Sequence, residues 1–217
     1  IRKMNLDKNA HILDVGTCMG TNLSALNSGG YSNAMGIDNS DLAIQICKKK
    51  NLNNVMLADA NSIPFSSNYF DCVIAMDILE HLEDEKRCLG EIFRVLKPGG
   101  CLLVTVPTFQ SLWGKGDELA HHFRRYLKES ISKVIKDSGF CVIKKYYFNC
   151  VLFLPILIAR KLTKVLNIKI KSELNMEDSF LNKMLYMVFK KDVELAPRLN
   201  LPVGVSCMVI AEKKEEK

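Results

Sequence analysis

The stretch at residues 11–20, HILDVGTCMG, constrains the fold of this chain more than any other. Its first half is an apolar run typical of a strand, Gly16 and Gly20 interrupt it, and good helix formers follow at residues 21–26. A strand that enters a glycine turn and continues as a helix is typical of the first βα unit of a nucleotide-binding domain. Because glycine lacks a Cβ and tolerates positive φ, such a turn can approach a ligand closely.

The composition is that of an ordinary globular domain. The 217 residues are 48% hydrophobic and 25% charged, enough for one domain with a full core. The net charge of +6 is a mild excess, and we expect no nucleic-acid partner. The longest uncharged apolar run, residues 150–159, is too short to span a bilayer. No signal peptide is visible, although the chain opens on Ile1, which leaves open whether residues precede it.

The cysteines are scattered, and no C-x-x-C pair occurs among them. Most lie in apolar runs, which is typical of reduced core residues and not of a disulfide framework or a zinc site. We therefore expect a cytoplasmic protein. The eight positions are Cys18, Cys47, Cys72, Cys88, Cys101, Cys141, Cys150 and Cys207.

Strands alternate with helices through the first half of the chain. Near-continuous apolar strands in such an alternation predict an α/β fold whose parallel sheet is covered on both faces. The expected strands are 12–15, 34–37, 55–58, 70–76 and 101–106, and the expected helices are 21–28, 41–50 and 84–96. Lys97-Pro98-Gly99-Gly100 is expected to close the third helix.

The pattern changes after residue 107, although we expect the whole chain, 1–217, to form a single domain. Residues 1–107 are the expected cofactor-binding half, and residues 108–149 supply a substrate-side loop, helix and strand. Residues 150–200 form a helical insertion large enough for a lid, with helical segments at 151–166 and 178–195. Residues 201–212 hold the last strand, which we expect to be antiparallel.

Four acidic residues stand at or just beyond successive strand ends: Asp14, Asp38, Asp59 and Asp77. In an open parallel sheet, ligands bind outside the carboxyl ends of the strands, where the strand order reverses. Asp38 lies about 20 residues after the glycine turn, where a carboxylate can accept hydrogen bonds from both ribose hydroxyls. Asp59 and the Ala60 amide could bind the amine and ring nitrogen of an adenine.

The glycine turn limits which nucleotide can bind. A dinucleotide fingerprint requires glycine at the positions of Gly16, Cys18 and Thr21, and two of these three fail. No Lys-Ser/Thr pair follows, so the turn is not a P-loop. S-adenosylmethionine has no phosphate and needs no such glycine cluster. A nicotinamide-dependent oxidoreductase therefore stays the weaker alternative.

These motifs together resemble the class I S-adenosylmethionine-dependent methyltransferases of type 11. The motifs are Ile12-Leu-Asp-Val-Gly-x-x-x-Gly20, Asp38, Asp59-Ala60, Asp77-Ile-Leu-Glu-His-Leu82 and Leu96-Lys-Pro-Gly-Gly100. The second half resembles a subgroup often found near glycosyltransferases of envelope polysaccharides, through Val106-Pro-x-x-x-x-Leu-Trp113, His122-x-Arg-Arg-Tyr126, Tyr147-Phe-Asn149 and Leu201-Pro-Val-Gly-Val-Ser206.

The resemblance implies a Rossmann-like, doubly wound, mainly parallel seven-stranded sheet. It also implies S-adenosylmethionine as the cofactor, S-adenosylhomocysteine as the product, and a small-molecule, glycan or lipid-linked acceptor, methylated most plausibly at oxygen. By the same resemblance the cofactor-binding residues are Asp14, Gly16, Thr17, Cys18, Gly20, Asp38, Asn39, Asp59, Ala60, Met76 and His81.

One departure from that family concerns Cys18, where the family usually has glycine. Positive φ at a residue with a Cβ costs of order 1 kcal/mol. We expect weakened or shifted cofactor binding, and a non-catalytic regulatory relative is a further alternative.

A metal site is a separate hypothesis. Asp77, Glu80 and His81 would share one face if helical, and with His122 they could bind a metal ion. The same turn is widespread in relatives that use no metal, so we expect none.

The segment 113–126 is the candidate catalytic region. His122 is the expected general base for a substrate hydroxyl, and Asp117 is expected to orient it. The expected substrate-binding residues are Trp113, Arg124, Arg125 and Tyr126. The alternative for the last three is a polar network that ties this segment to the sheet.

The insertion combines apolar helical faces with basic residues. Residues 151–159 are apolar on all sides, and Phe180, Leu181, Met184, Leu185, Met187, Val188 and Phe189 form a broad apolar face. Basic residues follow the first segment at Arg160, Lys161, Lys164, Lys169 and Lys171. We expect a helical lid that packs on itself and on the sheet. The alternatives are an apolar substrate chamber and peripheral membrane contact through residues 150–171.

Overall fold

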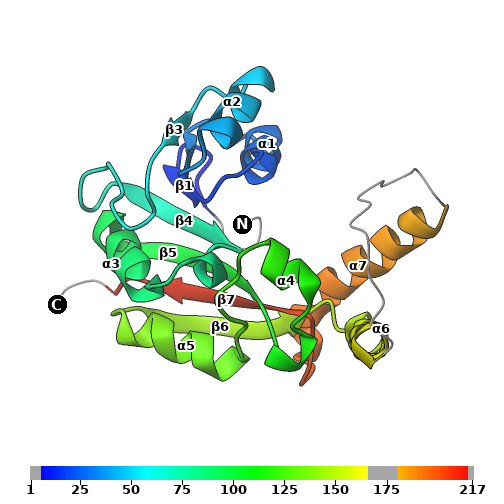
Figure 1. Cartoon of the computed structure of the whole chain (residues 1–217). Helices are drawn as coiled ribbons and strands as arrows, with labels where there is room; N and C mark the ends of the chain where they lie inside the picture. The colour runs from blue at the N-terminus through cyan, green and yellow to red at the C-terminus, as the bar shows by residue number, and fades with distance from the viewer. Residues whose placement is uncertain (1–5, 166–179, 215–217) are drawn as a thin grey trace.

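A seven-stranded sheet in the order β3-β2-β1-β4-β5-β7-β6 forms the centre of the computed structural model, which describes residues 6–165 and 180–214 (Figure 1). Its neighbouring strands are parallel except that β7 runs antiparallel to both β5 and β6. The strands are β1 (Ile12–Val15), β2 (Ala34–Asp38), β3 (Val55–Leu57), β4 (Phe70–Met76), β5 (Leu96–Pro107), β6 (Cys141–Phe148) and β7 (Ser206–Glu212).

Helices cover both faces of this sheet. They are α1 (Thr21–Ser28), α2 (Asp41–Lys49), α3 (Glu85–Val95), α4 (Lys115–Leu119), α5 (Lys128–Asp137), α6 (Phe153–Val165) and α7 (Phe180–Leu199), with 3-10 helices η2 (Leu79–His81) and η3 (Gln110–Leu112). The predicted α/β fold, with a Rossmann-like sheet and a helical insertion before an antiparallel last strand, is confirmed.

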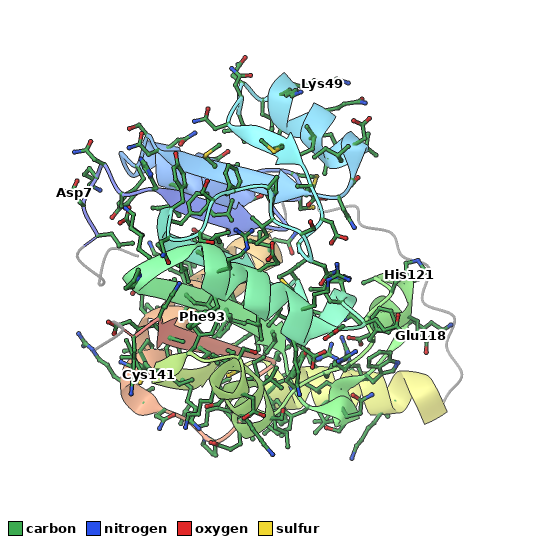
Figure 2. The ribbon with its side chains drawn as sticks, turned by 90° about the vertical axis from the view of Figure 1, so that its left-hand side faces the viewer. Asp7, Lys49, Phe93, Glu118, His121 and Cys141 are labelled. Carbon is green, nitrogen blue, oxygen red and sulfur yellow. The ribbon has the colours of Figure 1, made fainter. Side chains whose placement is uncertain are left out.

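The core lies in two layers because successive side chains of a strand point to opposite faces. Leu13 and Val15 of β1 belong to the larger layer, which α3 and α5 cover. Ile12 belongs to the smaller layer, which α1 and α2 cover. Figure 2 looks onto the α3 and α5 side, where the Phe93 and Phe140 rings lie edge to face with centroids 5.1 Å apart.

The start of β5 differs from the sequence prediction. Lys97-Pro98-Gly99-Gly100 does not close a helix as a free turn but belongs to β5, which begins at Leu96 directly after α3. Gly99 donates its N–H to the Lys213 carbonyl at 2.7 Å, and Lys213 donates its N–H to Gly100 at 2.9 Å. A shift in the β4–β5 register between Phe70 and Cys72 accommodates these extra residues.

The insertion differs from the prediction in its bounds. α7 continues to Leu199, past Pro197 in its last turn, and the last strand begins at Ser206. Residues 166–179, with Lys169, Lys171 and the start of the second predicted segment, lie outside the described residues. None of the described helices is both long and apolar enough to cross a membrane.

Gly20 shows why the turn after β1 needs glycine. It precedes α1 with φ +75°, in the left-handed region. A Cβ there would lie 2.4 Å from Leu52 Cδ1 and 3.0 Å from Cys47 Sγ. Both neighbours are buried on the α2 side, so the turn and α2 fix each other's position.

We predict that Gly20→Ala lowers the free energy of unfolding by about 1–3 kcal/mol, because it adds both backbone strain and overpacking. Gly90→Ala is the matched control, since Gly90 is exposed in α3 and a Cβ there meets nothing within 4 Å. The control should raise stability by about 0.5–1 kcal/mol. Urea denaturation measures both, and equal effects would contradict the assigned role of Gly20.

Candidate active site

The candidate site lies where the strand order reverses between β1 and β4. The loops that follow β1, β2, β3 and β4 meet there because these strands are parallel. Together they line a small pocket that is partly open to solvent. The lining residues are Gly16, Ile37, Asp38, Asn39, Ala58, Asp59, Ala60, Ile78 and Leu82.

Asp38 ties the end of β2 to the turn after β1. Its Oδ2 accepts the Cys18 N–H at 2.8 Å, and its Oδ1 accepts the Ser40 N–H at 2.9 Å. A carboxylate oxygen can accept more than one hydrogen bond, so both oxygens keep capacity for ligand hydroxyls. The predicted strand-end carboxylate therefore lines the pocket and also shapes the turn.

Cys18 keeps a left-handed conformation although it is not glycine. Its φ is 48°, its side chain is exposed, and its carbonyl accepts a hydrogen bond from Cys47 Sγ at 3.2 Å. Lys50 Nζ donates to the next carbonyl, that of Met19, at 2.9 Å. These contacts with α2 hold the turn in a conformation that costs a non-glycine residue of order 1 kcal/mol.

Asp14 and Thr17 bring unpaired polar atoms to the same turn. Asp14 is fully buried, and its Oδ1 accepts a hydrogen bond from Asn22 Nδ2 at 3.0 Å. Burial raises the pKa of the Asp14 carboxyl to about 6, against the opposing effect of Asn22. Asp14 Oδ2 and Thr17 Oγ1 have no hydrogen-bond partner among the described residues. The Thr17 hydroxyl also lowers the pKa of Asp14 and so lies near this carboxyl, and a carboxyl and a hydroxyl beside a glycine turn fit a polar ligand group.

Two of the predicted cofactor-binding residues lie apart from this pocket. Met76 lines a separate hollow of about 670 Å³ that α1 residues border on the other face of the sheet. His81 does not line the Gly16 pocket and instead contacts His122, with the two rings edge to face and centroids 4.5 Å apart. Five of the eleven predicted residues line the pocket, and Asp14, Thr17, Cys18 and Gly20 lie in β1 or in the turn that follows it.

Glu80, His81 and His122 form a compact cluster. One possible ligand atom from each lies within 4.8 Å of the others, and carboxylate and imidazole are common ligands of divalent metals. Asp77 does not share a helical face with them, because its φ is 50° and it precedes the three-residue η2. The expectation that the site holds no metal stays a prediction.

Glu80 is the least solvated member of this cluster. It is 1% exposed, and its Oε2 has no hydrogen-bond partner among the described residues. Burial, and then the negative charge of Asp77, raise the pKa of the Glu80 carboxyl to about 8. At neutral pH this carboxyl is therefore mostly protonated and can donate a hydrogen bond.

Asp117 is a buried carboxylate with four polar neighbours. Its Oδ1 accepts a hydrogen bond from Arg125 Nε at 2.7 Å and lies 3.0 Å from His122 Nδ1. Its Oδ2 accepts hydrogen bonds from the Gly114 N–H at 2.8 Å and from Arg160 Nη1 at 3.0 Å. Burial raises its pKa, but the Arg125, Gly114 and Arg160 hydrogen bonds outweigh burial and lower the pKa to about 2.

This arrangement makes His122 a candidate general base. An ionised carboxylate beside Nδ1 favours the tautomer that carries the proton on Nδ1 and leaves a lone pair on Nε2. Phe123 donates its N–H to the Glu80 carbonyl at 2.7 Å and so fixes this segment against η2. Figure 2 labels Glu118 of α4 and His121, the residue before His122.

The predicted substrate-binding residues all have contacts within the chain. Arg124 pairs with Glu85 and donates to the Glu83 carbonyl at 2.8 Å. Arg125 also donates to the Thr108 carbonyl at 3.0 Å, and buried Tyr126 donates to the Leu79 carbonyl at 3.3 Å. Trp113 is half-buried at the end of η3. A role in substrate binding stays a prediction for each of them.

Arg160 is a site residue that the sequence analysis missed. It counted there as one of several basic residues after an apolar segment, whereas the structure places its guanidinium on Asp117. No local signal distinguishes it from its neighbour Lys161. The contact spans 43 residues, so the pairing depends on where α6 packs.

The sheet order 3-2-1-4-5-7-6, with an antiparallel β7 and a pocket at the β1–β4 reversal, defines the Rossmann-like methyltransferase fold. Residues 13–104 match the family described as "Methyltransferase domain". This part of the chain therefore resembles a methyltransferase domain, and the match covers less than half of the 217 residues.

Curated relatives match parts of the chain. This chain is 36% identical over 89 residues to the ubiquinone/menaquinone biosynthesis C-methyltransferase UbiE of Erwinia tasmaniensis. The match covers 40% of this chain and 34% of that relative. This chain is also 33% identical over 159 residues to the sterol 24-C-methyltransferase erg6 of Schizosaccharomyces pombe. That match covers 68% of this chain and 42% of the relative. The matches thus span less than half of these relatives' lengths.

Solved structures share the fold at lower identity. One comes from the complex with the Haloferax volcanii Trm112 methyltransferase activator, with TM-score 0.67, 18% identity, and coverage of 98% of this chain and 86% of that one. Another is the Haemonchus contortus phosphoethanolamine N-methyltransferase 2 in complex with S-adenosyl-L-methionine, with TM-score 0.64, 22% identity, and coverage of 99% and 51%.

We predict a pH-dependent contribution of Glu80 to stability. Its folded pKa of about 8 exceeds the ordinary value of 4.5, so its contribution is present below pH 4.5 and is lost as the pH rises through 8. Glu80→Gln should flatten the pH dependence of the unfolding free energy over this window, by on the order of a few kcal/mol.

Urea denaturation between pH 5 and 9 makes the comparison, and the difference between wild type and variant isolates Glu80 from Asp14, whose pKa is also raised. Glu118→Gln is the control, because Glu118 is exposed on nearby α4. Parallel curves for wild type and Glu80→Gln would contradict the assignment.

Proposed function

We propose that the chain is a methyltransferase that uses S-adenosylmethionine to methylate a hydroxyl oxygen on a small-molecule, glycan or lipid-linked acceptor. The observation that carries the proposal is the pocket that Gly16, Asp38 and Asp59 line at the β1–β4 reversal, inside the methyltransferase domain. The relatives include quinone and sterol C-methyltransferases, which supports the reaction class and leaves the acceptor open.

The pocket residues fit the cofactor by their chemistry. Asp38 would accept hydrogen bonds from the ribose hydroxyls, and Asp59 with the Ala60 amide would bind the adenine edge. The unpaired Asp14 Oδ2 and Thr17 Oγ1 would serve the charged methionyl end. When bound, S-adenosylmethionine supplies an electrophilic methyl group on a sulfonium sulfur.

The His122–Asp117 pair supplies the base that oxygen methylation can use. Asp117 holds the proton on His122 Nδ1, and Nε2 would take the proton of the acceptor hydroxyl as oxygen attacks the methyl carbon. Methyl transfer from a sulfonium is intrinsically favourable, so positioning of the acceptor supplies most of the remaining rate. Trp113 and the Arg124–Tyr126 segment flank this pair in the sequence. Trp113 and Arg124, which are partly exposed, would contact the acceptor, and Arg125 and Tyr126 would hold the segment in place.

We also propose a cytoplasmic location and no nucleic-acid partner. None of the eight cysteines forms a disulfide, which is usual in a reducing compartment. The net charge of +6 is modest for a chain of this length.

We predict that the chain binds S-adenosylmethionine and S-adenosylhomocysteine and that Asp38→Ala weakens both by about 10- to 100-fold, because two charge-assisted hydrogen bonds are lost. Asp41→Ala is the control, since Asp41 is exposed in the first turn of α2. Isothermal titration measures the affinities. A thermal shift with a nicotinamide dinucleotide and none with S-adenosylmethionine would overturn the proposal in favour of an oxidoreductase.

We predict that His122→Ala lowers turnover by about 10²- to 10⁴-fold and changes cofactor affinity far less, because a general base acts on the chemical step. Release of S-adenosylhomocysteine with a panel of glycan, phenol and lipid-linked hydroxyl acceptors gives the rate, and titration gives the affinity. Equal losses in both would contradict the base role. Absence of turnover with every acceptor, despite cofactor binding, would favour a non-catalytic relative.

A further inference from the structure

Helix α6 is apolar on two opposite sides. Its inner side packs on the domain: Phe153 is buried, and its ring lies 5.1 Å from that of Phe109. Arg160 on this side donates to Asp117. A helix of a globular domain normally turns a polar side to water, so an apolar outer side needs an explanation.

The outer side of α6 carries a continuous apolar stripe. Val151, Leu154, Ile158 and Leu162 are 60%, 62%, 56% and 53% exposed. Leu154, Ile158 and Leu162 lie on one side of α6 because they are four residues apart and an α-helix has 3.6 residues per turn. Val151 lies in the turn just before the helix. Lys161 is exposed at the edge of this stripe. The stripe extends over most of the helix.

An apolar groove continues this stripe onto α7. The groove has a volume of about 260 Å³, and Val151 belongs both to the stripe and to the groove. Its lining residues are Cys150, Val151, Val188, Lys191, Asp192, Leu195, Ala196, Leu199 and Leu201. We call the stripe and the groove together the α6–α7 surface. In Figure 1 these helices stand at one side of the molecule, away from α1, α2 and α3.

Exposed apolar side chains are concentrated in this region. Of the twenty exposed large hydrophobic residues in the described part of the chain, eleven lie between residues 151 and 201. They are Val151, Leu154, Ile158, Leu162, Met184, Tyr186, Met187, Phe189, Leu195, Leu199 and Leu201. A cluster of this kind is typical of an interaction surface.

The same two helices hold most of the excess positive charge of the chain. The sequence of α6 and α7 has basic residues at Arg160, Lys161, Lys164, Lys183, Lys190, Lys191 and Arg198, and acidic residues at Asp192 and Glu194. The whole chain carries a net charge of +6. Asp192 is buried and accepts hydrogen bonds from the Cys150 and Val151 N–H groups. Of the two acidic residues, therefore, Glu194 is the exposed one.

We propose that the α6–α7 surface binds the surface of an anionic phospholipid membrane. Exposed apolar residues enter the interface, and neighbouring lysines lie against anionic headgroups, as in interfacial amphipathic helices. Neither helix is long and apolar enough to cross a bilayer, so the contact lies in the plane of the interface. A second copy of the chain fits less well, because it would bring the same basic residues together.

This contact places the membrane next to the candidate active site. Arg160 connects the inner side of α6 to Asp117, and Asp117 contacts His122. A bound membrane would therefore lie against the outer side of the helix whose inner side supports the His122–Asp117 pair. The membrane contact itself does not depend on methyl transfer, so binding can be measured independently.

The test is co-sedimentation of the full chain with vesicles of phosphatidylcholine and phosphatidylglycerol at 3:1, compared with phosphatidylcholine alone. We expect binding to the anionic vesicles that weakens at high salt. Ile158→Glu should lower the partition coefficient by at least about tenfold, because it puts a charge where an apolar side chain would enter the membrane interface. Leu42→Glu is the matched control, as Leu42 is 66% exposed on α2, and it should bind like wild type.

Two further variants separate the contributions of charge and folding. Ile158→Ser should also weaken binding without adding charge, and circular dichroism checks that it stays folded. Lys161→Glu should weaken vesicle binding more than Lys133→Glu. Lys133 is the control because its side chain is exposed on α5, outside the α6–α7 surface.

Three results would overturn the proposal. Wild type could fail to bind anionic vesicles, or Leu42→Glu could lose binding as strongly as Ile158→Glu. Light scattering could instead show a dimer that Ile158→Glu dissociates, with no vesicle binding, which would assign the surface to a second copy. None of these readouts uses turnover, so failure here leaves the proposed methyl transfer standing.

Discussion

The buried carboxylate of Asp117 organises the second half of this domain. Its two oxygens receive the Gly114 amide, two arginines and one histidine, from the segment 114–125 and from α6. The Arg125 side chain is 5% exposed, so each charge needs the other to offset its loss of hydration. Through this one group, the candidate base, the loop around it and the first helix of the insertion are held in one arrangement.

Local patterns in the sequence were sufficient to predict where most strands of the sheet lie in the chain. Apolar runs bounded by glycine and acidic residues predicted the strand Phe70–Met76 at its observed bounds, because strand and turn chemistry are local properties. The prediction was wrong at Lys97–Gly100, where a Pro-Gly-Gly sequence reads as a turn. The partner that makes it a strand is Lys213, more than a hundred residues away, and no local pattern reports such a pairing.

The candidate site was predictable to the extent that parallel strands fix it. Asp38 and Asp59 line one pocket because the carboxyl ends of parallel strands share an edge. Met76 lies elsewhere because alternate residues of β4 point to opposite faces. The partners of Arg160 and the burial of Glu80 depend on how α6, η2 and the 113–126 segment pack together, which the sequence does not encode in any spacing.

Cys18 has a consequence beyond its backbone strain. Among the eight cysteines it is the exposed one, and it lies in the turn that borders the candidate pocket. A thiol in that place makes the turn accessible to alkylating reagents and to oxidants. Cys18 thus puts a chemically addressable group beside Asp38, where a covalent label would report on the accessibility of this turn.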